Sequence, residues 1–176
     1  ISCTGKATIT NMGAELGATT SIFPYDESMS RYLRATNRAG IADVANEYAD
    51  MLRADDEVEA DPASFFDKIV EIDLSTLEPQ IVGPHSPDRA RPISQMAAEV
   101  ADADNNFIDE VSSALIGSCT NSSYEDMSRA ADIAEQAAAH GLAAAVPFMV
   151  TPGSEQVRAT IERDGQIGSL NKINST

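Results

Sequence analysis

The sequence predicts an α/β fold with a parallel sheet and crossover helices. In the second half of the chain, residues 111–116 and 146–150 form short apolar runs, and each run precedes a segment with helical periodicity. The order strand, helix, strand, helix is typical of parallel strands joined by crossover helices. With 176 residues, of which 43% are hydrophobic, the chain can form one medium domain or parts of two.

The first half predicts shorter elements. Thr4 or Thr8 is a suitable N-cap for a first helix, and Gly17 is a suitable end for it. In chain order we expect a helix over 4–17, a buried strand over 18–23, helices over 27–36 and 41–53, an exposed acidic loop over 50–61 and a strand over 68–74. Residues 79–92 hold four prolines, which disfavour regular structure, and a short helix is predicted over 93–101.

The helices of the second half carry local end signals. Ser122 and Glu125 match the S-x-x-E pattern of a capping box at the start of the first of them. Gly141 lies directly after its last predicted turn. The next helix is predicted to begin after Ser154 and to end at Gly165.

Composition excludes several classes of partner. A net charge of −16 repels nucleic acid over most of the surface. No apolar run reaches the length of about 18 residues that a membrane span needs. Two cysteines without a pairing motif, Cys3 and Cys119, favour a reducing compartment. The chain opens with Ile1 rather than Met, and we expect it to be an internal piece of a longer protein.

The stretch LIGSCTNSSYEDM, residues 115–127, places Cys119 between a predicted strand and a predicted helix. Ligands of open α/β sheets gather beyond the carboxyl ends of the strands, and a helix N-terminus favours a thiolate. Two interpretations are open: Cys119 is a metal ligand or nucleophile, or it is a small buried hydrophobic residue.

A cysteine nucleophile would need a nearby base, and the candidates are His85 and His140. His140 closes the helix that Cys119 precedes, which would hold the two about 25 Å or more apart. His85 lies in the proline-rich segment. The sequence contains no GxxxxGK[ST] phosphate-binding loop, and further metal ligands are not obvious.

A second candidate is NMGAE, in which Asn11 and Glu15 are four residues apart and predicted to share one helix face. Near a metal centre they could orient water or donate hydrogen bonds; the alternative is an ordinary polar face. Arg158 and Arg163 could bind carboxylates, with solvated surface ion pairs as the alternative.

Three segments together resemble the aconitase family, and within it the mitochondrial type. They are SCTGKATITNMGAELGATTSIFPYD, LIGSCTNSSYEDMSRAA and VTPGSEQVRATIERDG, in that order. The resemblance covers most of residues 1–170, and we expect residues 168–176 to depart from the family pattern. It implies parts of two aconitase-type α/β domains: the latter part of a second domain over 1–78, a linker or domain crossing over 79–110, and the first part of a third domain over 111–176.

The resemblance also implies a chemistry. Members interconvert citrate and isocitrate through cis-aconitate in the tricarboxylic acid cycle, with a [4Fe–4S] cluster held by three cysteines and one iron open to substrate. The cysteine of the family's GSCTN motif is a cluster ligand and corresponds to Cys119. The family's NMGAE segment places Asn11 in the cluster environment and Glu15 in the catalytic polar network. The implied partner is a tricarboxylate, without nucleic acid or membrane, in a monomeric protein of the mitochondrial matrix, or of the cytoplasm in a bacterium.

The sequence departs from the family pattern in ways that bear on activity. The CxxC pair that supplies the other two cluster ligands is absent, as are the family's substrate-binding arginines and catalytic serine. Cys3 does not correspond to a cluster ligand, and Lys6 and Thr10 replace the usual Met and Cys. We therefore expect the 176-residue chain alone to be inactive.

Other functions stay open from the sequence. A related hydro-lyase, such as homoaconitase or isopropylmalate dehydratase, would share the cluster chemistry. RNA binding occurs in the superfamily, but the charge of −16 disfavours it. An inert partial domain would leave sheet edges and core faces uncovered.

Overall fold

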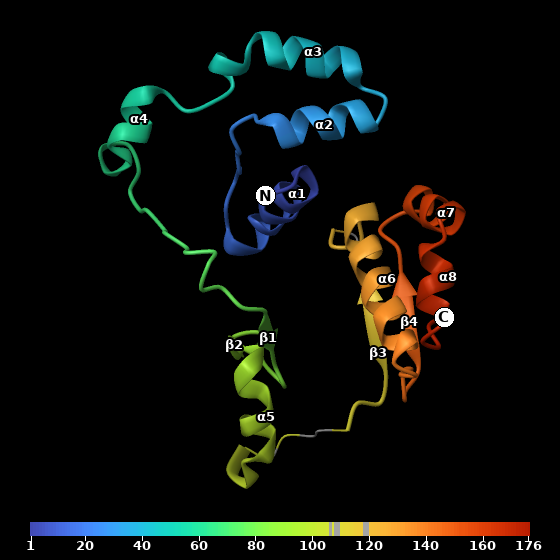
Figure 1. Cartoon of the computed structure of the whole chain (residues 1–176). Helices are drawn as coiled ribbons and strands as arrows, with labels where there is room; N and C mark the ends of the chain where they lie inside the picture. The colour runs from blue at the N-terminus through green and yellow to red at the C-terminus, as the bar shows by residue number, and fades with distance from the viewer. Residues whose placement is uncertain (106, 108–109, 118–119) are drawn as a thin grey trace. The chain divides into compact units, whose positions relative to one another are not determined.

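The computed structural model describes residues 1–105, 107, 110–117 and 120–176 (Figure 1). The chain divides into two compact units, one formed by Ile1–Ala60 together with Ser113–Thr176, the other by Asp61–Ser112. The α/β fold class is confirmed, because the first unit contains a parallel strand pair joined by a helix. Within the described residues, no helix is both long and apolar enough to cross a membrane.

The first unit contains the predicted parallel pair, β3 (Ala114–Gly117) and β4 (Phe148–Thr151). Leu115 lies opposite Met149 in the register, and α6 (Tyr124–Ala139) is the crossover helix (Figure 1). Both strands begin two or three residues later than predicted. Ser175 forms a parallel bridge with Phe148, so the last residues of the chain continue the pairing beyond β4.

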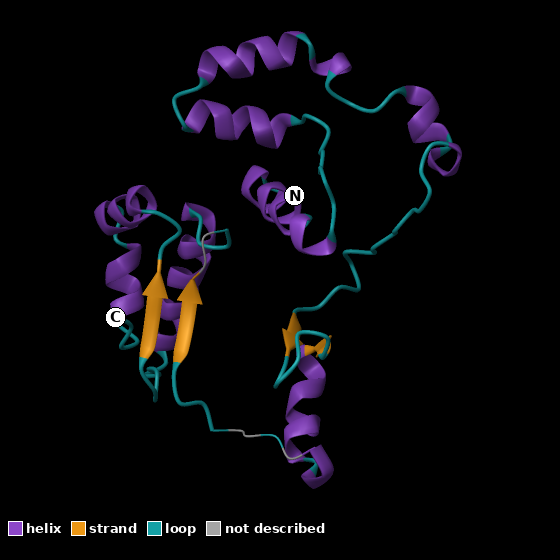
Figure 2. Ribbon diagram, turned by 180° about the vertical axis from the view of Figure 1, so that it is seen from behind, coloured by secondary structure: helices purple, strands orange, loops and turns teal. Residues whose placement is uncertain are grey.

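The core of this unit lies between the helices and one face of the strand pair. α6 packs against α7 (Glu155–Arg163) and α8 (Gln166–Asn171). Alanine side chains on α6 let the helices approach closely, and Leu170 fills the space between them. The opposite face of the strands is seen in Figure 2, and there Leu115 and Met149 are 58% and 46% exposed. The core cluster comprises Ala131, Ala134 and Leu170, with Ala130, Val150 and Ile173 packed against it.

The predicted end signals of these helices are confirmed, except for one. Gly141 and Gly165 adopt positive φ after α6 and α7, and Ser154 caps α7 by accepting from the Val157 amide. The capping box of α6 is formed by Ser123 and Asp126, so the predicted box at Ser122 and Glu125 was wrong by one residue.

The N-terminal part of the first unit is helical. Ser2, rather than Thr4 or Thr8, caps the first helix, which ends at Met12 and not at Gly17 as predicted. Gly17, with φ 80°, instead closes the separate 3-10 turn that follows. The helix predicted over 41–53 breaks at Tyr48 into an α-helix and a 3-10 turn. The elements are α1 (Cys3–Met12), η1 (Ala14–Leu16), α2 (Glu27–Ala35), α3 (Ala39–Glu47), η2 (Ala49–Met51) and α4 (Asp56–Ala60).

The strands predicted over 18–23 and 68–74 were wrong. In the part of the chain that the structure describes, neither segment pairs with a strand, and Ile22 and Val70 are exposed. Both segments have the residue types that suit a half-buried pleated surface, but a strand also needs a neighbour to receive its hydrogen bonds.

The second unit is a small hairpin and helix. β1 (Gln80–Val82) pairs antiparallel with β2 (Ala90–Pro92), so the expectation that 79–92 lacks regular structure was wrong. The helix predicted over 93–101 is confirmed as α5, Ile93–Ala101. Buried Arg91 connects these elements, because its Nε lies 2.9 Å from Glu99 and its guanidinium stacks on Phe107. The unit also holds the 3-10 turns η3 (Pro62–Ser64) and η4 (Ala103–Asn105).

The close approach of the two strands at Gly117 generates a testable prediction. A Cβ at Gly117 would lie 2.7 Å from the Thr151 carbonyl oxygen and 2.8 Å from the Thr151 Cβ. Gly117→Ala must therefore push the strands apart, and we expect a loss of about 1–3 kcal/mol in the free energy of unfolding. Chemical denaturation measures this loss. Gly40→Ala is the matched control, because a Cβ there meets nothing within 4 Å; equal stability of the two variants would contradict the prediction.

Candidate functional site

The candidate site lies around the connection from β3 to α6, residues 118–123. Cys119 and its neighbour Ser118 are outside the described residues, so the structure does not test the prediction for Cys119. The residues on both sides are described. Gly117 ends β3, and Ser122 is fully buried while its carbonyl accepts a hydrogen bond from the Gly153 amide at 3.0 Å. This bond joins the loop after β3 to the loop after β4.

Asn11 lies beside this connection. Its side-chain amide donates from Nδ2 to Thr120 Oγ1 at 2.9 Å, although the two residues are 109 positions apart in the sequence. The fold therefore brings the NMGAE segment to the residue that directly follows Cys119. Nothing in the local sequence pattern indicates this contact.

Glu15 lies outside the helix that carries Asn11. α1 ends at Met12, and the chain tightens into the 3-10 turn η1, which contains Glu15. The prediction that Asn11 and Glu15 share one α-helical face was therefore wrong in its geometry. Gly13 permits the close approach of Ser21, because a Cβ there would lie 2.5 Å from Ser21 Oγ. Glu15 is exposed to solvent.

The opposite end of α1 contacts the first turn of α6. Thr4 Oγ1 donates to Glu125 Oε2 at 2.5 Å, and Ser2 Oγ lies 3.2 Å from Thr4 Oγ1. Arg129 donates to the other carboxylate oxygen of Glu125 at 2.6 Å. The hydrogen bond from Thr4, with smaller contributions from Ser2 and Arg129, lowers the pKa of the Glu125 carboxyl below its ordinary value.

An ion pair fixes α1 to the start of α2. The Lys6 side chain is 9% exposed and lies 2.5 Å from Asp26 Oδ2, and the Phe23 ring centroid lies 6.0 Å from the ammonium. Asp26 also caps α2 by accepting from the Met29 amide. The Lys6 ammonium, followed by the Ser28 hydroxyl, holds the pKa of the Asp26 carboxyl well below its usual range.

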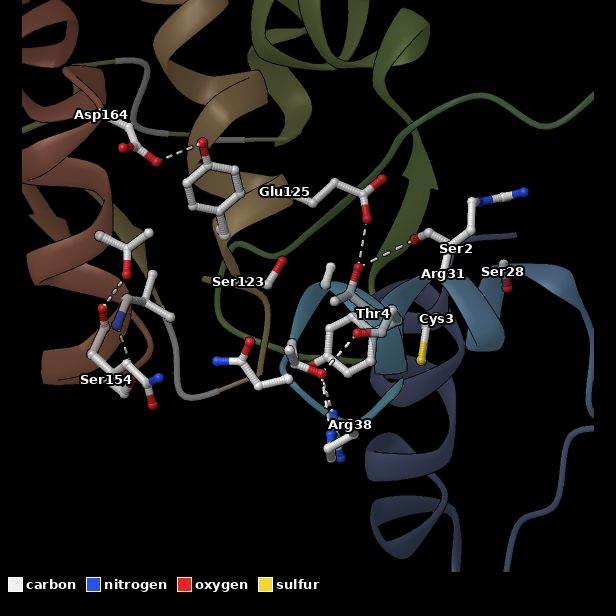
Figure 3. Close-up of a pocket in the computed structure, with 18 of the residues that line it drawn as sticks. Ser2, Cys3, Thr4, Ser28, Arg31, Arg38, Ser123, Glu125, Ser154 and Asp164 are labelled. Carbon is white, nitrogen blue, oxygen red and sulfur yellow. Dashed lines mark hydrogen bonds between the residues drawn. The ribbon is translucent and has the colours of Figure 1, made fainter. Parts of the chain in front are cut away.

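A cavity of about 1060 Å³ opens between the N-terminal turns of α1, α6 and α7 and the helix α2 (Figure 3). Cys3, for which no role was predicted, is half-buried in its wall. The charged side chains around it have partners nearby: Arg31 pairs with Glu27, and Arg163 pairs with Asp164.

The other candidates do not join a site. Arg158 pairs with Glu155 and Glu162, which fits the surface-pair interpretation, and these carboxylates raise the pKa of its guanidinium. His140 is the C-cap of α6, and His85 belongs to the second unit. Among the described residues, no group of three or more His, Cys, Asp and Glu side chains could hold a metal ion.

The sequence of this chain matches a known protein family over its whole length. A model of the aconitase family, described as aconitate hydratase, matches residues 1–176. The chain belongs to the aconitase family. The match extends to the end of the chain, so the expectation that residues 168–176 depart from the family pattern was wrong.

Similar proteins include mitochondrial enzymes of fungi. The chain is 60% identical over 173 residues to the mitochondrial aconitate hydratase of Saccharomyces cerevisiae, covering 98% of this chain and 21% of that protein. It is 55% identical over 172 residues to the counterpart of Schizosaccharomyces pombe, with the same coverage. It is also 55% identical over 170 residues to the mitochondrial homocitrate dehydratase of S. cerevisiae, covering 95% of this chain and 20% of that protein. The chain thus spans about a fifth of the length of these relatives.

The residues of this chain do not form a complete site for the family's cluster. The aconitase resemblance calls for three thiolates, and the sequence contains two cysteines. Cys3 begins α1 and Asn11 lies near its end, which separates them by about 12 Å along the helix axis. Cys3 is therefore well separated from Asn11 and Thr120, and the role that the resemblance implies for Cys119 stays a prediction.

The Lys6–Asp26 pair predicts a pH dependence. The folded pKa of Asp26 lies below the unfolded one, so the pair stabilises the fold fully above the ordinary carboxyl pKa of about 4, and this stabilisation is lost as the pH falls toward the folded value. Asp26→Asn keeps the cap of α2 but removes the charge beside a buried ammonium. Because the Asp26 side chain is half-exposed and solvent screens the pair, we expect a loss of about 1–2 kcal/mol at pH 7 and a weaker acid dependence, measured by denaturation at pH 7 and pH 3.

The control for this prediction is Asp43→Asn. Asp43 pairs with Arg34 at 2.6 Å, but both side chains are exposed, so its removal is expected to cost less than about 1 kcal/mol. If Asp26→Asn were no more destabilising than Asp43→Asn at pH 7, the prediction that the Lys6–Asp26 pair stabilises the fold more than an exposed ion pair would be contradicted.

Proposed function

We propose that this chain is part of a longer hydro-lyase that interconverts citrate and isocitrate through cis-aconitate. The family match over residues 1–176 supports the reaction class. The observation that carries the assignment of the site is the 2.9 Å hydrogen bond from Asn11 to Thr120, because it joins the two segments that the family resemblance places at the cluster. The proposal assigns no activity to the 176-residue chain alone.

In this proposal, Cys119 is one of three thiolate ligands of a [4Fe–4S] cluster, and the other two lie outside these 176 residues. The cluster would supply an open iron that acts as a Lewis acid. Asn11 would hold Thr120 in place next to the ligand. Glu15, exposed on η1, would belong to the polar network around the substrate.

The remaining assignments follow from the relatives. Their names place them in mitochondria, so we propose the mitochondrial matrix for the protein in a eukaryote. The partner is a small tricarboxylate. The net charge of −16 supports the absence of nucleic-acid binding. We also propose that the protein is monomeric.

Substitution of the two cysteines in the full-length protein tests the cluster assignment. We expect Cys119→Ser to lower both the iron content and the turnover of citrate by more than about tenfold, because a hydroxyl is a poor replacement for a thiolate ligand. Iron analysis, visible absorption and steady-state kinetics measure these losses. Cys3→Ser is the matched control and is expected to keep its iron. Wild-type iron content and citrate turnover in Cys119→Ser would contradict the assignment of Cys119 as a cluster ligand.

A second candidate is the dehydration of homocitrate. It is favoured by the 55% identity to a homocitrate dehydratase, which is close to the identity to the aconitate hydratases. The ratio of kcat/KM for citrate to that for homocitrate, measured on the full-length protein, separates the two. We expect citrate to be preferred, since an extra methylene is worth about 1–3 kcal/mol, or roughly 10–200-fold, in a fitted pocket. A preference for homocitrate would select the second candidate.

A further inference from the structure

Helix α1 holds the β3–α6 connection at two points. Near one end, Asn11 donates to Thr120 at 2.9 Å; near the other, Thr4 donates to Glu125 at 2.5 Å. Thr4 and Asn11 are seven residues apart, which is two helical turns, so they lie on the same face and are separated by about 10 Å. This face of α1 therefore contacts Thr120, in the connection after β3, and Glu125, in the first turn of α6.

Glu125 is not needed to cap α6. Ser123 and Asp126 form the capping box, so the terminal amides are satisfied without it. The Glu125 carboxylate instead binds Thr4 with one oxygen and Arg129 with the other. Figure 3 shows Thr4 between Ser2 and Glu125, with the hydroxyl directed at the carboxylate. A hydroxyl that donates to a carboxylate forms a short, charge-assisted hydrogen bond.

The helix dipole alone does not explain this arrangement. Glu155 occupies the first turn of α7 and pairs with Arg158, which the dipole and the local ion pair fully account for. Glu125 has the same kind of arginine partner one turn later, but it also binds a residue 121 positions away. This long-range contact is what distinguishes Glu125 from an ordinary first-turn acid.

We propose that Thr4 and Glu125 are positioning residues, which fix α1 against the β3–α6 connection and so set the Asn11–Thr120 contact. Neither residue touches the substrate in this proposal; both act through Asn11 and Thr120. The effect on activity rests on the proposed function, because it requires that the connection carry a cluster ligand. The effect on the connection itself does not depend on it.

The test uses the full-length protein and three variants of the contact. Thr4→Val removes the hydroxyl at constant shape, Glu125→Gln removes the charge, and Thr4→Ser keeps the donor. Hydrogen exchange of the amides of residues 120–123 is measured first, followed by the rate of iron loss to a chelator and by kcat and KM for citrate. Glu155→Gln is the control, because it removes a first-turn carboxylate with an arginine partner but without a contact to α1.

We expect Thr4→Val and Glu125→Gln each to speed amide exchange in residues 120–123 and iron loss by roughly tenfold, while Thr4→Ser and Glu155→Gln leave both near wild type. The double variant Thr4→Val/Glu125→Gln should show less than the sum of the two single effects, since both substitutions weaken the same Thr4–Glu125 bond. kcat should fall more than KM changes. Thr4→Val keeps the test valid if Glu125→Gln fails to fold.

Exchange rates in Thr4→Val and Glu125→Gln that match Glu155→Gln would overturn the proposal, and so would additive effects in the double variant. A full-length protein without iron or citrate turnover would instead overturn the proposed function, and the exchange measurement would still decide whether α1 is held by this contact.

Discussion

The parallel pairing of β3 with β4 is the constraint on which the first unit depends. Parallel strands require a crossover, so α6 must pass over one face of the pair before the chain can return. Ala131 and Ala134 allow the helix to lie close, and Leu170 from α8 closes the core. Because both strands then end at the same edge, the loops that follow Gly117 and Thr151 begin side by side, and the bond from the Gly153 amide to the Ser122 carbonyl joins them.

Helix α1 completes this edge from a distant part of the chain. It contributes no strand and buries little apolar surface. Among the described residues, it contacts Thr120 through Asn11 and the first turn of α6 through Thr4, and both contacts are polar. Polar contacts of this kind are directional, so they fix orientation more than they add stability. The Lys6–Asp26 pair holds the same helix to α2. α1 is therefore fixed on two sides, which suits an element that positions side chains rather than forming a core.

The sequence predicted the second half of the fold well because its signals are local. The Ser154 cap, the glycines after α6 and α7, and the alternation of strand and helix each act within a few residues. The strands predicted over 18–23 and 68–74 failed because strand formation depends on a partner that a local pattern does not supply. The capping box was missed by one residue because Ser122 and Ser123 both fit the pattern, and only the folded chain shows which serine faces the amides.

The same distinction separates what was predictable in the candidate site. The resemblance brought Asn11, Glu15 and Cys119 forward, but the Asn11–Thr120 and Thr4–Glu125 contacts join residues more than 100 positions apart and have no local signature. Glu125 was assigned to helix capping for a sound local reason, and that assignment hid its contact with Thr4. Once Asp126 takes over the cap, Glu125 is an acid without a local task beyond Arg129, and its bond to α1 becomes the informative one.

The exposed apolar groups of the first unit bear on where the activity resides. On α3 and at its C-cap, Ile41, Val44 and Tyr48 are at least half exposed. On the uncovered face of the strand pair, Leu115 and Met149 are exposed as well. Apolar side chains at regular helical and strand spacing are typical of faces that pack against further protein. The relatives are about five times longer than this chain, so they contain the mass to cover such faces. The reaction is therefore proposed for a protein of the relatives' length, in which such faces have partners.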